Sequence, residues 1–260
     1  MRVVRFMTLL SVEFRKIKRS RLLLLFFAAS VILWIPSVLN AELNFTMQAE
    51  GISPENSFFI QGFMGMAWFM YPAGMVVGTV LISQTERTNR GMLKMLSLPV
   101  GRAWLCLAKF VVLVVLSAAQ VLMMTGMYYI SAAAAGRLQG YSFLLPPLFV
   151  AGEAGLLFCA SLPMLAVFWM LSVAVRTPIF SVGLGLASIV PSVFAINTKV
   201  WFAYPMCYPF FVITAEYGKL AENLDTAQVD LVPWIPVAVV ITGVCLLVAC
   251  LCFGQGERRE

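Results

Sequence analysis

The chain has 260 residues, of which 61% are hydrophobic and only 12% are charged, and its mean hydropathy is +0.91. A soluble domain of this size could not bury so much apolar surface, so the composition excludes an ordinary water-soluble protein. The formal net charge of +6 does not indicate nucleic-acid binding, because the basic residues follow the ends of apolar stretches. Membrane orientation and anionic lipid headgroups account for basic residues placed in this way.

Residues 2–19 are predicted to form an amphipathic helix that lies in the membrane interface. Apolar residues such as Phe6 and Leu10 recur at three- and four-residue spacing, while Glu13 and Lys16 occupy other faces. This pattern is typical of an interfacial helix. A generic basic flank of the first span is the alternative interpretation.

Six apolar stretches follow, each close to or above the ~20 residues that a helix needs to cross about 30 Å of hydrocarbon. Barrel strands would be about 10 residues long with alternating polarity, so we predict an all-α fold. The predicted spans are residues 22–39, 58–82, 103–131, 148–175, 179–196 and 231–253.

The basic residues orient these spans, because 15 of the 18 fall at the N-terminus, at the C-terminus or on alternate connections. Lys and Arg near span ends are retained in the cytoplasm. Both termini are therefore predicted to be cytoplasmic, which requires an even number of spans. The three remaining bases, on the outer side, are Arg137, Lys199 and Lys219.

The predicted outer connections are acidic and, before the last span, aromatic. The first half of residues 197–230 is too aromatic for a solvated loop, so we predict short or re-entrant helices there, with breaks at Pro205 and Pro209. Seven acids against three bases give the outer side a net charge of 3 − 7 = −4, which attracts cations. The acids are Glu42, Glu50, Glu55, Glu216, Glu222, Asp225 and Asp230.

The sequence lacks several motifs that are common in enzymes. The chain contains no histidine, its cysteines lack CxxC spacing, and it has no GxxxxGK[ST] phosphate loop. These absences argue against a His-dependent triad, a His-ligated metal and the usual mode of ATP binding. We therefore predict no catalytic residue, no metal and no cofactor bound by this chain.

The segment Ser83–Arg102 has the most specific pattern in the chain. Met92, Leu93 and Leu96 form an apolar face on a short helix, which would lie parallel to the membrane and fit a cleft on a cytoplasmic partner. The charged neighbours of this face in the same segment are Glu86, Arg87, Arg90 and Lys94.

An interfacial helix with the text Glu13–Ser20, a span, and then the Glu86…Gly91…Leu96…Arg102 pattern resembles the type-2 ABC transporter permeases, over essentially the whole chain. The resemblance implies a single permease domain over residues 1–260. It implies that residues 2–19 form an elbow helix, that Glu86–Leu96 is the coupling helix, and that re-entrant helices precede the last span. The implied partners are two ATPase subunits, which use ATP and Mg²⁺, and a second permease, identical or homologous.

The substrate is indicated less directly. The chain's size, the absence of a fused ATPase and the text of residues 199–211 most resemble bacterial plasma-membrane permeases that protect against lantibiotics and bacitracin-like peptides. The function implied is the ATP-driven export of cationic antimicrobial peptides. Export of another amphiphile, drug or lipid-linked substrate is the first alternative, and a channel or secondary transporter without an ATPase is the second.

Four residues are candidates for a substrate pathway. Glu153 lies about six residues into the fourth span, where an ionisable group is costly and faces protein or water; it either contacts a cationic substrate or serves as a structural hydrogen-bonding group. Ser181, Gly185 and Ser188 form a small-residue face on the fifth span. That face either packs against a neighbouring helix or, as the resemblance implies, lies at the interface between two permeases.

Overall fold

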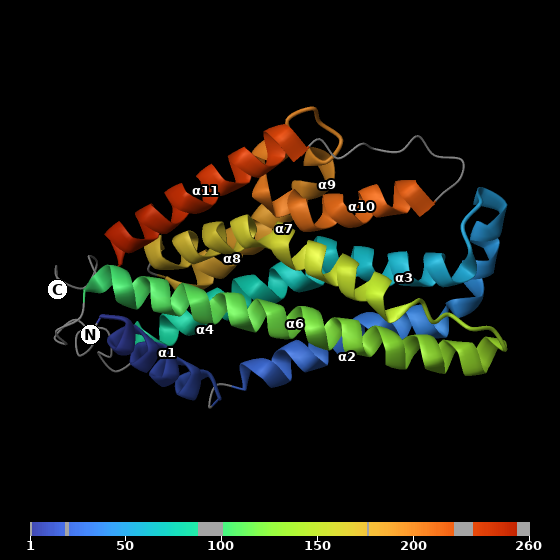
Figure 1. The fold of residues 1–260 in the computed structure, drawn as a ribbon, viewed down its shortest axis with the longest axis horizontal. Coiled ribbons are helices and arrows are strands. Elements are labelled where there is room, and N and C mark those ends of the chain that lie inside the picture. The colour runs from blue at the N-terminus through green and yellow to red at the C-terminus, as the bar shows by residue number, and fades with distance from the viewer. Residues whose placement is uncertain (1, 19–20, 88–100, 176, 221–230, 254–260) are drawn as a thin grey trace.

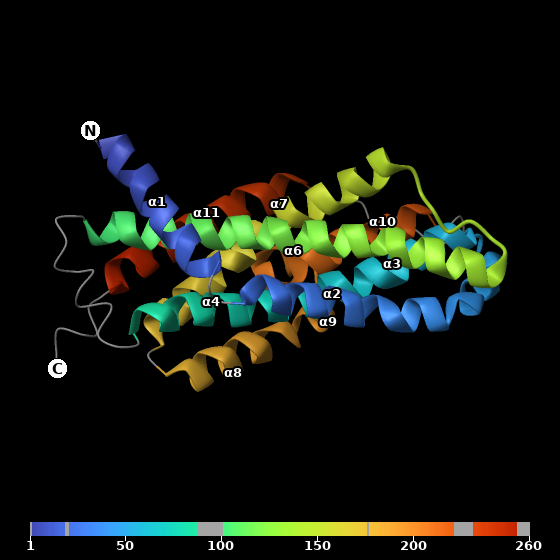
Figure 2. The same cartoon turned by 90° about the horizontal axis from the view of Figure 1, so that it is seen from below.

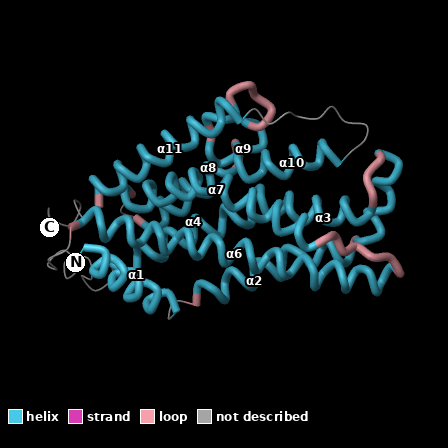
Figure 3. The backbone as a smooth tube through the Cα atoms, in the orientation of Figure 1, coloured by secondary structure: helices cyan, strands magenta, loops and turns pink. Residues whose placement is uncertain are grey.

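The computed structural model describes residues 2–18, 21–87, 101–175, 177–220 and 231–253. These residues form helices joined by short loops, and no strand occurs among them (Figure 3). Within the described ranges, six helices are long and apolar enough to cross a membrane. The predicted all-α fold with six such helices is confirmed.

The segment predicted to be interfacial forms helix α1, Arg2–Lys18. The first, third, fourth and sixth long helices are α2 (Leu22–Leu39), α6 (Arg102–Gln139), α7 (Pro147–Ala174) and α11 (Leu231–Cys252). The second long helix has three parts, which are α3 (Pro54–Gly65), the π-helix η2 (Met66–Met70) and α4 (Tyr71–Arg87). The fifth consists of α8 (Pro178–Ile189) and the short α9 (Ser192–Ala195).

Two of these helices are longer than the apolar pattern predicts. The second begins at Pro54 rather than at residue 58, because a proline is favoured in the first turn of a helix. The third runs to Gln139 rather than to residue 131, through a run of alanines, the best helix formers. It ends at Gly140, whose φ of 65° is the left-handed conformation of a helix C-terminus. The first half of the connection predicted at 132–147 is therefore helical.

The helices form an inner and an outer group. In the most apolar 18-residue stretch of each span, the second long helix, α6 and α7 bury more than half of their residues, whereas α2, the fifth long helix and α11 bury less than a quarter. Helix α6 runs the length of the bundle, with α2 and α11 on opposite edges (Figure 1). Helix α1 lies against the first part of α6, at the end of the molecule where α11 finishes (Figure 2). This common end agrees with an even number of crossings.

The segment before α11 contains η4 (Trp201–Ala203), η5 (Pro205–Cys207) and α10 (Tyr208–Leu220). Helix α10 packs against α7 and α3 and buries much of its surface. Pro205 begins η5, as expected of a break, and the break predicted at Pro209 falls just before it, where η5 ends at Cys207 and α10 begins at Tyr208. Pro209 is the second residue of α10, where the missing N–H is one that no helical carbonyl needs. Residues 221–230, with Glu222, Asp225 and Asp230, lie outside the described residues.

A core of aromatic side chains joins α2, α3 and α6. Trp34 is 1% exposed, and its indole N–H donates to the carbonyl of Met124 at 3.2 Å. The same ring lies directly over Gly62, where an added Cβ would be 2.1 Å from it. Glycine at position 62 therefore allows α2 and α3 to approach each other closely.

Candidate functional site

Glu153 is placed at the contact between α7 and α10. It is the seventh residue of α7, about 9 Å along the helix axis from the helix start, and its side chain is half-buried. Its Oε2 atom is buried and has no hydrogen-bond partner among the described residues. Glu216 and Lys219 of α10 are close enough to act electrostatically on this carboxylate. A substrate contact and a structural hydrogen-bonding role for Glu153 therefore both stay predictions.

Glu216 and Lys219 form an ion pair one turn apart on α10, with Nζ 2.9 Å from Oε2. The Glu216 side chain is 10% exposed, whereas that of Lys219 is 56% exposed. The hydrogen bond to Glu216 is the main cause that raises the pKa of Lys219, and the charge of Glu153 adds to it. Lys219 therefore remains protonated at physiological pH.

These three side chains, called here the α7–α10 charge cluster, hold two carboxylates and one ammonium group, a formal charge of +1 − 2 = −1. A buried carboxylate oxygen that accepts no hydrogen bond favours the binding of a cation or of a hydrogen-bond donor. Because Lys219 is mostly exposed, it can leave Glu216 without opening the core. Within the described ranges, no three His, Cys, Asp or Glu side chains gather in a way that could hold a metal ion.

The small-residue face of α8 does not join this cluster. Ser181 and Gly185 are buried, and a Cβ at Gly185 would be 2.6 Å from Cγ1 of Val76 in α4. The Ser188 hydroxyl donates to the Gly185 carbonyl at 2.7 Å. This face therefore packs α8 onto α4 within the subunit. The face of α8 left uncovered is the apolar one, which includes Ile179, Phe180 and Leu184.

Residues 9–192 match the family model described as ABC-2 family transporter protein. The matched range is more than half of the chain and contains α2 through α8. This chain belongs to the ABC-2 transporter family. No curated protein and no solved structure matches it.

An ABC-2 permease is a non-catalytic transmembrane subunit that pairs with ABC ATPase subunits. The chain is accordingly a multi-pass membrane protein and the membrane component of an ATP-driven transporter, rather than a channel or a secondary transporter. The family match ends at residue 192, so α10 and its half of the charge cluster lie beyond it.

The segment predicted to couple this ABC-2 permease to its ATPase is described only at its beginning. Glu86 and Arg87 are the last two residues of α4. The other predicted coupling residues lie outside the described residues; they are Arg90, Met92, Leu93, Lys94 and Leu96. The ends that the segment joins, of α4 and of α6, lie at the same end of the bundle as α1 (Figure 2).

A buried ion pair at this end was not predicted from the sequence. Lys109 of α6 is 1% exposed, and its Nζ is 2.7 Å from Oε2 of Glu13 in α1. The other oxygen of Glu13 accepts from Lys16 at 2.9 Å. The spacing of residues 2–19 predicts Glu13 away from the apolar face of the helix, yet its side chain is buried against α6. An acid alone among bases in α1, and a lysine inside an apolar span, were the available signals.

Proposed function

We propose that this permease, with a second permease copy or homologue and two ATPase subunits, exports cationic amphipathic peptides of the lantibiotic and bacitracin type from the bacterial plasma membrane. Self-protection or resistance is the biological role that this activity serves. Both termini are cytoplasmic in this proposal, which places the α1 end of the bundle inside and η1 (Ala41–Glu50) outside. ATP binding and hydrolysis switch the pair of permeases between two states.

The observation that carries this proposal is the α7–α10 charge cluster. Its net negative charge and the unpaired Oε2 of Glu153 offer a partner for an amine or guanidinium group. In this proposal the substrate's cation takes the place of the Lys219 ammonium on Glu216 or bridges to Glu153. An uncharged amphiphile forms no ion pair with this cluster. Its transport should therefore not depend on Glu153, whereas the transport of a cationic peptide should.

The coupling segment is proposed to act at the opposite end. The ridge of Met92, Leu93 and Leu96, with the charges of Glu86 and Arg87 before it, docks into an ATPase cleft and transmits closure of the ATPases to α4 and α6. Support comes from the ordering of the chain, because this segment connects the ends of those two helices directly.

The decisive experiment measures peptide-stimulated ATP hydrolysis by the permease and its ATPase in liposomes. The probes are a synthetic cationic amphipathic peptide and an analogue whose lysines are replaced by norleucine. A charged hydrogen bond contributes about 1.5–3 kcal/mol, so Glu153→Gln should raise the half-maximal concentration of the cationic peptide about 10- to 100-fold. The response to the neutral analogue should not change.

Glu42→Gln is the matched control, because Glu42 is an exposed outer acid on η1 and its loss changes the net charge equally. It should alter the half-maximal concentration little. Equal responses of the wild type and Glu153→Gln to the cationic peptide, at equal abundance, would remove Glu153 from the substrate pathway. A preference of both for the neutral analogue would favour another amphiphile as substrate.

A further inference from the structure

The second long helix is interrupted near its middle by the π-helix η2. The N–H of Tyr71 donates to the carbonyl of Met66, five residues back, which is the wide spacing of a π-turn. The cause lies in the next residue, Pro72, which has no N–H to donate and crowds the turn before it. At least one carbonyl of that turn is therefore left without its helical donor.

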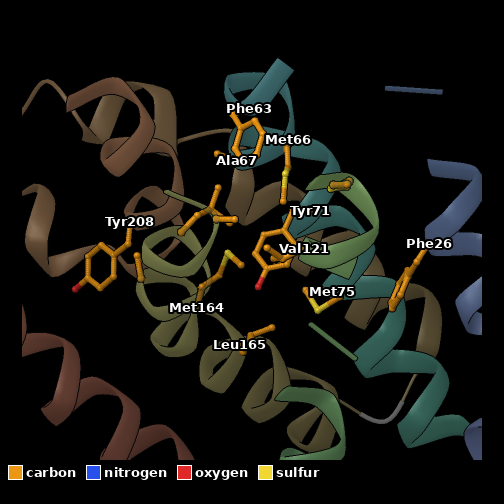
Figure 4. Close-up of a cluster of buried hydrophobic side chains, with 14 of the residues drawn as sticks. Phe26, Phe63, Met66, Ala67, Tyr71, Met75, Val121, Met164, Leu165 and Tyr208 are labelled. Atoms are coloured by element: carbon orange, nitrogen blue, oxygen red, sulfur yellow. The ribbon is translucent and has the colours of Figure 1, made fainter. Parts of the chain in front are cut away.

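Tyr71, directly after the π-turn, fastens the helix to two neighbours. Its side chain is fully buried between α6 and α7, near Met164 and Val121 (Figure 4). The hydroxyl lies 2.5 Å from Oγ of Ser117 and 2.6 Å from Oγ of Ser161. Ser161 donates to the carbonyl of its own helix at Phe158, so Tyr71 donates to Ser161 and accepts from Ser117.

One turn farther along α4, its contact with α6 contains a polar side chain without hydrogen bonds. Gln120, three residues after Ser117, is fully buried, and in the part of the chain that the structure describes neither its Nε2 nor its Oε1 has a hydrogen-bond partner. Its amide lies against Gly74, where an added Cβ would be 2.6 Å from Nε2. A buried amide without hydrogen-bond partners lowers stability. Here the amide lies beside a helix in which a backbone carbonyl also lacks its donor.

We propose that residues Met66–Gly74 form the hinge of this permease. The hydroxyl cluster of Tyr71, Ser117 and Ser161 is a latch, and its hydrogen bonds are formed in the state described. Gln120 forms hydrogen bonds only in the other state, after α4 has rotated about the hinge. When the latch opens, its hydroxyls can donate to backbone carbonyls. The carbonyl that lacks a donor because of Pro72 then comes within reach of the Gln120 amide, which has no hydrogen-bond partner in the state described. The two arrangements exchange hydrogen bonds rather than lose them, as a two-state element requires.

The hinge also lies where the two proposed working parts must communicate. Trp68 in the π-turn contacts Phe210 of α10, the helix that carries Glu216 and Lys219. In the other direction, α4 continues to Glu86 and Arg87, at the start of the coupling segment. The inference rests on the ATP-driven cycle of the proposed function but not on the identity of the substrate.

The test is a pair of cysteines, Gly74→Cys with Gln120→Cys, placed across the contact between α4 and α6. The double variant is sterically suitable, because removal of the Gln120 amide makes room for the new side chain at position 74. Disulfide formation on mild oxidation is measured in the nucleotide-free complex with the ATPase and in the complex trapped with ATP and vanadate. Each single cysteine variant is the control for pairing with native cysteines.

We expect the disulfide yield to fall at least fivefold on trapping, and oxidation to abolish the ATP-driven cycling that the same double variant shows when reduced. Equal yields in both states, or full cycling by the cross-linked protein, would overturn the hinge. If the pair forms no disulfide in either state, Tyr71→Phe decides, since loss of the latch should raise basal ATP hydrolysis per assembled complex severalfold. An unchanged basal rate would assign the hydroxyl cluster to packing alone. Peptide is absent from these measurements, so a wrong substrate cannot change their outcome.

Discussion

The two ends of α6 are held by opposite kinds of interaction. At its first end, Lys109 and Glu13 form a buried ion pair that fastens α1. At its other end, Tyr128 is packed among rings, with the ring centroid of Trp34 5.6 Å away and that of Phe59 5.4 Å away. The first contact depends on two charges that must both be present, whereas the second is distributed over many apolar atoms. A single change is therefore tolerated differently at the two ends.

The largest expected effect is at the charged end, with Glu13→Gln. This change leaves the Lys109 ammonium buried beside a neutral amide, and removing one partner of a buried ion pair costs about 3–5 kcal/mol. The free energy of unfolding, measured in mixed micelles with increasing SDS, should fall by that amount. The double variant Glu13→Gln with Lys109→Met should recover most of the loss, because it removes both charges. A double variant as unstable as the single one would mean that the charges are not the cause.

A smaller effect is expected at the aromatic end, where two adjacent tyrosines form a matched pair. The Tyr128 hydroxyl donates to the carbonyl of Phe143 and accepts from the N–H of Leu145, both at 3.0 Å. Tyr128→Phe should therefore cost about 1–3 kcal/mol, because two backbone groups lose their partner while the ring remains. The buried hydroxyl of Tyr129 has no partner within the described ranges, so Tyr129→Phe should leave the unfolding free energy unchanged or raise it. Equal losses from the two variants would contradict these hydrogen bonds.

The contrast between the two ends also marks what could be predicted from the sequence. Each of the spans α2 and α11 is one continuous apolar run in the sequence. Hydropathy alone therefore predicts that it is a helix, and predicts its ends closely. The ion pair joins residues 96 positions apart, and no spacing rule connects such a pair. Lys109 inside an apolar helix did indicate that a partner was needed, without indicating which one.

The candidate site divides in the same way. Glu153 could be singled out from the sequence, because an acid inside a span is rare. Its neighbours on α10 could not, because the second half of residues 197–230 is polar and acidic in the sequence, whereas Glu216 is 8% exposed. The π-turn was foreseeable in part, since Pro72 inside a span is a known cause of helix irregularity. The hydroxyl cluster at Tyr71 depends on how three helices meet, which a single sequence does not record.

The smallest expected effect separates the buried charge from its exposed neighbour. Lys16 also bonds to Glu13, but its side chain is 34% exposed, and an ion pair open to water contributes about 0–1 kcal/mol. Lys16→Ala should therefore lower the unfolding free energy by less than about 1 kcal/mol, and added salt should reduce even that difference, because water and ions screen the pair. The loss caused by Glu13→Gln should hardly respond to salt, since Lys109 lies out of reach of solvent. If both variants lose stability equally and respond equally to salt, the α1 end is held by surface charge, and the contrast between the two ends of α6 disappears.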